Sequence, residues 1–398
     1  MTEENKKGYK IAVFSWESLH SFRVGGLAQA VSKITRALAD LGHEVHLFTR
    51  VDADKEQTEY DRINGVHVHR VDFPGSDNII GFVHNMCMSM LQRFRDVERE
   101  IGSFDIVHGH DWMVVDALHE LKQKGYPIVL TFHSTEYARN GGEFGDWWEF
   151  DEISGKEWYG GYIADKVTTV SSSLKDELMW LYDVPEKKIE VVSNGGELGR
   201  YNESVDPGKI KEGYDIHPLA PVILFVGRIE YQKGPDLFVK AIPHVLSHKP
   251  DAKFIVVGRG GMRDYIEDLV GKLGVSDSVR ILGYVSDHEY KEVLNAADIV
   301  CIPSRNEPFG LVLYEAWDAK KAVVATDVGG LSENIDNFEN GIKVYTYPES
   351  IAWGINYIID DPQGVKHLGE KGKEKLQNCT WPIQARRYES IYDDLLND

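Results

Sequence analysis

The densest group of chemically active side chains follows a short apolar run at residues 299–302. Glu307 lies in the loop after this run, and Gly310 ends the loop where a helix is predicted to begin near Leu311. Glu315 then falls in the first turns of that helix. Carboxylates accept hydrogen bonds from sugar hydroxyls, and the free amides at a helix start favour a phosphate. The alternative is structural, with Glu307 in a loop salt bridge and Glu315 as a helix-dipole carboxylate.

Two cations flank a second strand-to-helix loop at residues 227–234. Arg228 and Lys233 both lie within reach of one diphosphate if the loop folds at a strand end. The alternative is a salt-bridged loop. The glycine-rich turn at residues 258–261 fails the dinucleotide-binding pattern because Arg263 stands where the third glycine is required, and the chain has no P-loop motif.

A third turn, after the first predicted strand, carries Arg23, Gly25 and Gly26 ahead of a predicted helix. Glycines let a ligand approach the backbone closely, and an arginine beside a helix start favours phosphate. A tight turn with no ligand explains the same residues, so the turn by itself leaves both interpretations open.

Histidines gather near strand ends in the first half of the chain, as His108, His110 and His133, with Asp111 and Trp112 beside them. The composition is that of metal ligands, but a helical His pair with a Glu base is missing, so we expect no metal. We favour a sugar, whose apolar face would stack on Trp112 and whose hydroxyls need polar partners. The aromatic segment at residues 147–150, with Trp158 and Tyr159, predicts an acceptor site, a packing role or a subunit contact.

The elements that must position these groups alternate between short strands and longer helices. A first series of predicted strands covers residues 10–15, 43–49, 66–71, 105–108, 128–132, 166–170 and 189–192. A second series covers 222–226, 253–257, 279–282, 299–302, 322–326 and 342–344. Such alternation predicts an α/β fold of two doubly wound, Rossmann-like domains, at 1–200 and 201–380. An amphipathic helix at 381–398 follows. Ligands of such sheets bind at the carboxyl ends of the strands, so we expect a central cleft between the domains.

Composition limits the partners. The 398 residues include 44 Lys and Arg against 64 Asp and Glu, a formal charge of −20, which disfavours nucleic acid and anionic membranes. Three cysteines without close spacing favour reduced thiols. No stretch has the length of a membrane span, and the polar start is too short of apolar residues for a signal peptide, so we expect a cytoplasmic protein without stable membrane insertion. The sequence leaves the oligomeric state open.

The chain resembles the retaining glycosyltransferases of family 4, with the GT-B fold, and among them the bacterial and archaeal glycogen synthases. The resemblance runs over nearly the full length and is carried by motifs in a fixed order. These are Arg23-Val24-Gly25-Gly26-Leu27, His110-Asp111-Trp112, Thr131-Phe132-His133, Asn194-Gly195, Gly227-Arg228, Lys233-Gly234, and Glu307-Pro308-Phe309-Gly310 through Glu315.

The resemblance implies a role for each matched position. Arg228 and Lys233 would hold the donor diphosphate and stabilise the leaving group, Glu307 would contact the donor sugar, and Glu315 the nucleotide ribose. His133 and Asp111 would lie at the sugar hydroxyls. Donor-binding contacts are further implied for Arg23, Gly25, Gly26, Phe309, Gly310, Leu311, Tyr284 and Val285. No cofactor or metal is implied, because the Arg–Lys pair replaces the metal. The resemblance further implies that the domain at 1–200 is the acceptor side, that the domain at 201–380 binds the nucleotide sugar, and that the helix at 381–398 packs back on the first domain.

The implied reaction is hexosyl transfer with retention, in which the leaving phosphate serves as base and no nucleophile role is assigned to Glu307. The donor would be a nucleotide-diphosphate sugar, ADP-glucose or UDP-glucose, and the carbohydrate acceptor glycogen or another α-glucan. Two departures bear on the acceptor: glycogen synthases usually carry Lys at Arg23, and the family often has a different sequence at Gly196-Glu197. A small-sugar, sugar-phosphate or lipid-linked acceptor stays open, as do a nucleotide-sugar epimerase and a non-enzymatic sugar-binding protein.

Overall fold

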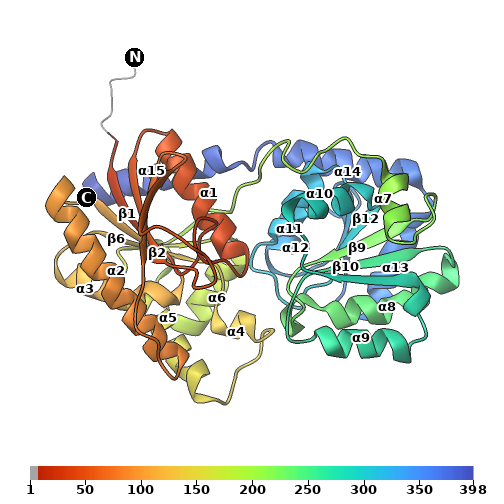
Figure 1. Ribbon diagram of the computed structural model, residues 1–398, viewed down its shortest axis with the longest axis horizontal. Coiled ribbons are helices and arrows are strands. Elements are labelled where there is room, and N and C mark those ends of the chain that lie inside the picture. Colours follow the sequence, from red (N-terminus) through yellow and green to blue (C-terminus); the bar gives the residue numbers. More distant parts are fainter. Residues whose placement is uncertain (1–7, 398) are drawn as a thin grey trace, which may run out of the picture. The chain divides into compact units, whose positions relative to one another are not determined.

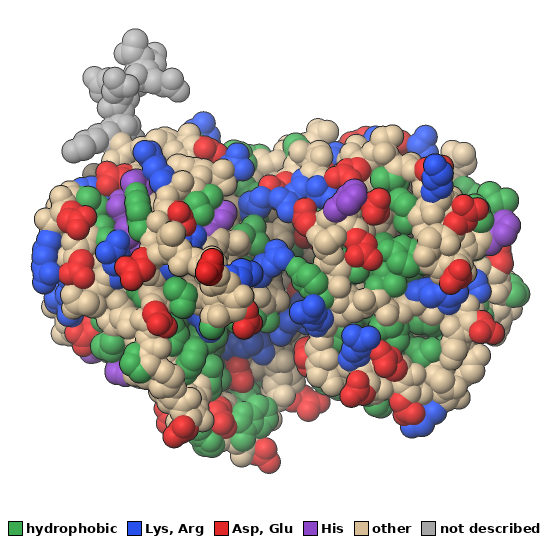
Figure 2. All heavy atoms as spheres, in the orientation of Figure 1, with side chains coloured by type: hydrophobic (Ala, Val, Ile, Leu, Met, Phe, Trp, Pro, Cys, Tyr) green, Lys and Arg blue, Asp and Glu red, His purple; other side chains and the backbone are tan. Residues whose placement is uncertain are grey.

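A computed structural model describes residues 8–397, so the first seven residues of the polar start and the last residue of the predicted terminal helix lie outside the described part. The chain divides into two compact units. The N-terminal unit comprises the described residues of Met1–Tyr137, Phe144–Gly195 and Trp381–Asp398, and the C-terminal unit comprises Ala138–Glu143 and Gly196–Thr380. Acidic and basic side chains are interspersed over both units on the face shown in Figure 2.

The N-terminal unit is built on an 8-stranded sheet in the order β3-β4-β2-β1-β5-β6-β7-β8. Its strands are β1 Lys10–Phe14, β2 Glu44–Arg50, β3 Tyr60–Ile63, β4 Val66–Val71, β5 Ile106–His110, β6 Ile128–Phe132, β7 Lys166–Thr169 and β8 Ile189–Val191. All neighbouring pairs are parallel except β3 with β4. Parallel strands are covered on both faces by helices, which explains why β1, β5 and β6 are almost wholly buried.

Helices of this unit form two groups. The helix α1 Gly26–Asp40 packs against α15 Trp381–Asn397, so the end of the chain returns to the first unit (Figure 1). The second group, whose members pack on one another, contains α2 Ile79–Ile101, α3 Val115–Gln123 and α5 Trp148–Ile163. The remaining helical segments are η1 Trp112–Val114, α4 Glu136–Arg139, α6 Ser172–Tyr182 and η2 Glu186–Lys188.

The C-terminal unit is built on a 6-stranded sheet, entirely parallel, in the order β11-β10-β9-β12-β13-β14. Its strands are β9 Val222–Val226, β10 Lys253–Val257, β11 Val279–Gly283, β12 Ile299–Ile302, β13 Ala322–Thr326 and β14 Ile342–Val344. Its helical segments are α7 Pro207–Gly213, η3 Tyr231–Lys233, α8 Pro235–His248, α9 Arg263–Lys272, η4 Ser276–Ser278, α10 Asp287–Ala296, α11 Leu311–Asp318, α12 Gly329–Asn334, α13 Pro348–Ile359 and α14 Pro362–Leu376.

The main core of this unit lies between the sheet and the helices α8, α9 and α13. Ile223 and Phe225 of β9 point to it together with Phe238 of α8 and Ile351 and Ile355 of α13, and each of these side chains is at most 1% exposed. The predicted α/β class with two doubly wound parallel sheets is therefore confirmed. One strand was missed: β3 is short, polar and partly exposed at the sheet edge, and it pairs with β4 through the turn at Asn64 and Gly65.

Candidate active site

The carboxyl edge of the C-terminal sheet brings a lysine and a glutamate into direct contact. Lys233 ends the segment η3 after β9, and Glu307 lies in the loop after the neighbouring strand β12. The Lys233 Nζ atom donates to both Glu307 carboxylate oxygens, at 2.8 and 2.7 Å. The Ser304 hydroxyl donates to Glu307 Oε2 at 3.0 Å, and Glu307 is only 7% exposed. The sequence-predicted cation and carboxylate thus form one compact, partly buried ion pair, which is the loop salt bridge that the structural alternative predicts for both residues.

Two glycines outside the predicted site fix the loop that carries Glu307. The Gly330 amide donates to the Glu307 carbonyl at 2.8 Å, and a Cβ atom on Gly329 would approach the same carbonyl oxygen to 2.2 Å. Gly310 adopts φ 96°, a left-handed conformation that favours glycine, where the chain turns into α11. Gly329 and Gly330 were missed by the sequence reasoning, because two glycines after an apolar strand do not reveal which loop they touch.

Phe309 and Leu311 flank this turn. The Phe309 side chain is 4% exposed and packs edge-on against the Tyr314 ring at 5.0 Å, so only its backbone is available to a ligand. Leu311 opens α11, whose first amides have no acceptor within the helix. The implied contact at Phe309 is therefore a backbone contact, and Gly310 has only its backbone to offer.

Arg228 lies on the same β9-to-α8 loop as Lys233. Its Nη2 atom donates to Gln232 Oε1 at 2.7 Å, and the side chain is partly exposed. Gln232 is buried at 3% exposure and is a residue the sequence reasoning missed. A neutral amide partner leaves the charge of the Arg228 guanidinium uncompensated at this contact, as a diphosphate site requires.

Glu315 lies apart from this ion pair, in a separate contact network on α11. Its Oε1 accepts from the Tyr201 hydroxyl at 3.1 Å and its Oε2 from the Tyr290 hydroxyl at 2.5 Å, and Glu315 is 8% exposed. Burial, and next the nearby Glu315 charge, raises the pKa of both tyrosines. Neither tyrosine was predicted from the sequence, since both are distant from Glu315 along the chain.

Tyr284 and Val285 follow β11 directly. Tyr284 is 51% exposed, and the Arg259 guanidinium lies over its ring at 4.4 Å from the centroid. Val285 is buried at 9% exposure. This edge of the sheet therefore offers a flat aromatic and cationic surface beside backbone groups, as a nucleotide base would need.

In the N-terminal unit, a carboxylate already contacts the glycine-rich turn ahead of α1. Glu17 Oε2 accepts from the backbone amides of Val24 and Gly25, at 2.8 and 3.0 Å, and Glu17 is 6% exposed. Arg23, Gly25 and Gly26 are exposed, and nothing lies within 4 Å of the position of a Cβ on Gly25. The turn thus binds an anionic group, as its glycines predict, and that group is a side chain the sequence reasoning did not consider.

Asp111 and His133 lie together at the carboxyl ends of β5 and β6. Asp111 has φ 59°, in the left-handed range, and its Oδ1 accepts from the His133 backbone amide at 2.7 Å. The structure therefore brings these two sequence-predicted residues into contact. Trp112 is a correction: its ring is 4% exposed and packed in the interior, so it cannot serve as a stacking platform for a sugar.

Behind His133 lie two buried histidines, His110 in hydrogen-bond contact with it and His108 in ring contact with His110. His110 Nδ1 is 3.0 Å from His133 Nε2, and the His110 ring stacks on that of His108 at 4.4 Å. His108 in turn contacts the Tyr392 hydroxyl of α15 through Nδ1 and the Thr131 hydroxyl through Nε2, both at 2.7 Å. Burial lowers the pKa of His108 and of His133 to about 3 and that of His110 well below its usual value. These rings are neutral at pH 7.

The hydrogen-bond pattern selects a tautomer for His133. His110 Nε2 is buried and has no hydrogen-bond partner among residues 8–397. A buried N–H without an acceptor is rarer than a buried acceptor without a donor, so the single N–H of neutral His110 belongs on Nδ1. His110 then donates to His133 Nε2, and His133 carries its own N–H on Nδ1. His133 is thus held as a hydrogen-bond donor.

The aromatic segment of the N-terminal unit is largely on the surface. Trp147, Trp148 and Trp158 are between 41% and 50% exposed, while Phe150 is buried. Trp158 stacks on Tyr162 at 5.8 Å. Their exposure is compatible with either a ligand or a protein contact, and the role of this segment stays a prediction.

Two largely parallel α/β sheets, with cations, carboxylates and a glycine-rich turn at their carboxyl edges, are what a GT-B glycosyltransferase requires. Comparison with known proteins agrees. Residues 24–200 match the family model "Glycosyltransferase Family 4" and residues 208–375 match "Glycosyl transferases group 1". The chain belongs to the family 4 glycosyltransferases of the GT-B fold.

Its relatives extend over nearly the whole chain. An uncharacterized glycosyltransferase of Methanocaldococcus jannaschii is 34% identical and covers 96% of this chain and 97% of its own length. Glycogen synthase of Mycobacterium tuberculosis is 26% identical and covers 96% of this chain and 94% of its own length. A D-inositol 3-phosphate glycosyltransferase of Catenulispora acidiphila is 27% identical, with coverages of 94% and 91%. Sucrose-phosphate synthase from Thermosynechococcus elongatus superposes with a TM-score of 0.82 at 22% identity, covering 98% and 99%.

Two properties of the described residues concern membranes and metals. Among residues 8–397, no helix has both the length and the apolar character needed to cross a bilayer. Within the same residues, no three His, Cys, Asp or Glu side chains are placed to hold a metal ion.

Proposed function

We propose that this protein transfers a hexosyl group, glucose, from ADP-glucose or UDP-glucose to a carbohydrate acceptor, with retention and without a metal ion. The observation that carries the proposal is the ion pair between Lys233 and Glu307. The pair places a cation beside a carboxylate at a sheet edge where phosphate-binding loops of α/β folds lie. The chemistry fits a donor whose diphosphate needs the cation and whose sugar hydroxyls need the carboxylate.

Donor binding would exchange the partner of Lys233. The diphosphate supplies a stronger anion for Lys233 and Arg228, so Glu307 is released to accept hydrogen bonds from sugar hydroxyls. As the bond between the anomeric carbon and the phosphate oxygen breaks, both cations stabilise the charge on the leaving nucleoside diphosphate. The acceptor hydroxyl forms the new bond on the same face, and its proton passes to the leaving phosphate oxygen. Because the cations are built into the loop, the step needs no metal.

The N-terminal unit would supply the groups for the sugar. His133, held with its N–H on Nδ1 by His110, donates to a hydroxyl oxygen, and Asp111 accepts a hydrogen bond in return. Glu315, between Tyr201 and Tyr290, would accept from the nucleotide ribose. Arg23, Gly25 and Gly26 would approach the donor phosphate after Glu17 leaves the amides of Val24 and Gly25. That the two sheet edges face one another across a cleft stays a prediction, as do cytoplasmic location and oligomeric state.

The acceptor has two candidates. A glucan is favoured by the similarity to a glycogen synthase, and a phosphorylated cyclitol or sugar by a comparable similarity to D-inositol 3-phosphate glycosyltransferases. We propose the glucan and test it against the second candidate directly.

The test is a panel of donors and acceptors. The protein is incubated in EDTA with ADP-glucose, UDP-glucose, GDP-mannose or UDP-N-acetylglucosamine, with glycogen, D-inositol 3-phosphate or no acceptor, and released nucleoside diphosphate is measured. We expect release from a glucose donor that rises with glycogen and yields an α-linked product by NMR. Release that rises only with inositol phosphate would move the acceptor to the second candidate. Dependence on added Mg²⁺, or a β-linked product, would overturn the proposed mechanism.

A further inference from the structure

A pocket of about 430 Å³ opens on the C-terminal unit at the edge of the sheet opposite to the candidate active site. Its lining includes Pro221, Asp251, Asp298 and Lys321, which precede β9, β10, β12 and β13. Glu307 and Lys233 follow the carboxyl ends of the same sheet. The pocket is therefore separate from the groups assigned to the donor.

Five lysines line this pocket, against two aspartates, in a chain whose formal net charge is −20. The five are Lys211, Lys249, Lys320, Lys321 and Lys366. In so acidic a protein, evenly distributed surface charges would not place this many lysines in a single pocket. Such concentration is what a site for an anionic ligand requires.

The inner wall holds more positive charge than its own carboxylate can balance. Lys211 is 6% exposed and donates to Asp298 Oδ2 at 3.0 Å and to the Ala220 carbonyl at 2.9 Å. Lys321 donates to the Asn295 carbonyl at 2.6 Å, a neutral acceptor, and it shares the same Asp298 electrostatically. Burial lowers the pKa of Lys321, as expected for an ammonium group with no carboxylate of its own. Two confined lysines around one aspartate leave one charge for a ligand to balance.

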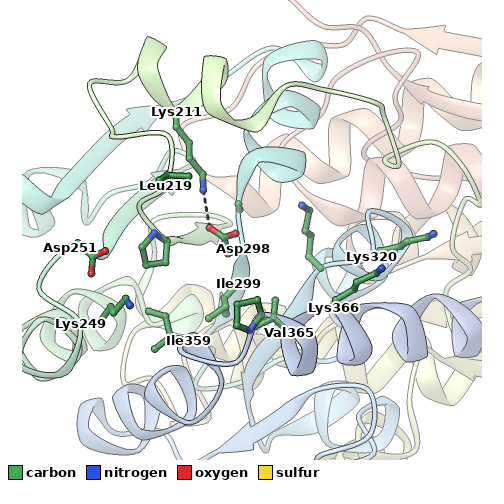
Figure 3. A pocket seen from close by; sticks show the side chains of 14 residues that line it. Lys211, Leu219, Lys249, Asp251, Asp298, Ile299, Lys320, Ile359, Val365 and Lys366 are labelled. Carbon is green, nitrogen blue, oxygen red and sulfur yellow. Dashed lines mark hydrogen bonds and ion pairs between the residues drawn. The ribbon is translucent and has the colours of Figure 1, made fainter.

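The two sides of the pocket rim differ in the charged residues that they offer to a ligand. Figure 3 shows Lys320 and Lys366 extending on one side of the pocket, and Asp251 and Lys249 on the other. Lys320 is exposed, and among residues 8–397 its Nζ has no hydrogen bond or ion pair; Lys366 is 3.9 Å from Glu370, at the limit of an ion pair. Lys249 is already bound to Asp360 at 3.1 Å. The cations available to a ligand are therefore on the Lys320 side.

The floor between the two sides is apolar, formed by Ile299, Ile359 and Val365 with two prolines. A volume of this size accommodates a small metabolite rather than a bare ion. The apolar face of a sugar ring fits the floor, and Asp251 can accept from its hydroxyls.

We propose that this pocket binds a phosphorylated monosaccharide, with its phosphate on Lys320, Lys321 and Lys366 and its hydroxyls toward Asp251. The site is independent of the proposed transferase activity, because none of its residues belongs to the donor-binding edge.

Calorimetric titration of the full chain with ribose 5-phosphate tests the proposal, with ribose and inorganic phosphate as comparison probes. Saturating UDP or ADP is present to occupy the donor site. The double variant Lys320→Gln/Lys366→Gln is expected to weaken ribose 5-phosphate binding at least tenfold. The control Lys371→Gln removes a lysine of the same helix, α14, that pairs with Glu374 outside the pocket, and should leave binding unchanged. Circular dichroism verifies that all variants fold.

Three results would overturn the proposal. The first is no binding of ribose 5-phosphate by the wild-type protein, and the second is a loss in the double variant no greater than in the control. The third concerns the orientation of the ligand. Asp251→Asn is expected to weaken ribose 5-phosphate and leave inorganic phosphate unchanged, so equal effects on both probes would refute the assignment of the hydroxyls to Asp251.

Discussion

Replacement of Lys233 by methionine tests whether Glu307 depends on a cation. In the structure the Glu307 side chain is 9% exposed and its two oxygens share the ammonium group, with Ser304 as one further donor. Loss of a hydrogen bond to a charged, poorly solvated group costs about 1.5–3 kcal/mol. Because ~1.4 kcal/mol is a factor of ten, Lys233→Met should lower the folding equilibrium constant roughly ten- to hundredfold.

The second substitution in the cycle is Glu307→Gln. A neutral amide does not require the ammonium, so the double variant Lys233→Met/Glu307→Gln should recover at least half of the lost free energy of unfolding. Lys240→Met is the control, because Lys240 pairs with Asp236 while being 41% exposed, and such pairs are worth at most about 1 kcal/mol. Urea denaturation followed by circular dichroism gives the free energies of unfolding of the wild type, the three variants of the cycle and the control.

The same variants are also compared in their binding of a nucleoside diphosphate and in sugar transfer. Glu307→Gln frees Lys233 from its internal partner, so ADP or UDP should bind at least as tightly as to the wild type while sugar transfer is lost. Lys233→Met should lose both. If Glu307→Gln weakens nucleoside diphosphate binding as much as Lys233→Met does, or if the double variant is less stable than Lys233→Met alone, the proposed exchange of partners is refuted.

Three further predictions follow from other contacts. Glu17→Gln removes the charge that competes for the Val24 and Gly25 amides, so the KM for the donor should fall severalfold; a rise would show that Glu17 organises the turn instead. Burial lowers the pKa of His108 from 6.5 to about 3. The stability of the folded protein is therefore retained above pH 6.5 and lost as pH falls toward 3, by up to about 1.4 kcal/mol per pH unit. The dependence of the urea midpoint on pH should be less steep in His108→Gln. Tyr392→Phe leaves His108 Nδ1 buried without a partner and should cost about 1–3 kcal/mol in urea denaturation, more than Tyr388→Phe, and equal losses would contradict this.

Much of the fold follows from patterns that are local in the sequence. Strands such as β9 and β13 are continuous apolar runs because both faces of a parallel sheet are covered, and such runs are visible without a structure. The strand β3 was not predicted, because its residues Tyr60–Ile63 are polar and lie at an exposed edge.

The candidate site was predictable where residue type and chain position agree. Lys233 and Glu307 each follow a strand, and adjacent parallel strands place their ends together, so their proximity could be expected. Contacts that join distant segments could not be predicted. Nothing in the sequence indicates that Glu17 lies at the glycine-rich turn or that Tyr201 lies beside Glu315. Trp112 was misjudged for a related reason, because an aromatic residue near a strand end is as easily buried as exposed.

The resemblance to family 4 accounted for the remaining assignments, and the comparisons confirm the family. They leave the roles of individual residues to experiment. The structure adds physical reasons for several of these roles, such as the tautomer that His110 sets on His133 and the backbone character of the Phe309 contact.

The most direct test of the central claim is acceptor-dependent release of nucleoside diphosphate from UDP-glucose or ADP-glucose in EDTA, measured for the wild type, Lys233→Met and the control Lys240→Met. The account predicts that glycogen raises release by the wild type and by Lys240→Met, and that Lys233→Met, although folded, loses it by at least a hundredfold. Release by folded Lys233→Met at the wild-type rate would contradict the account, because the charge on the leaving diphosphate would then be stabilised elsewhere.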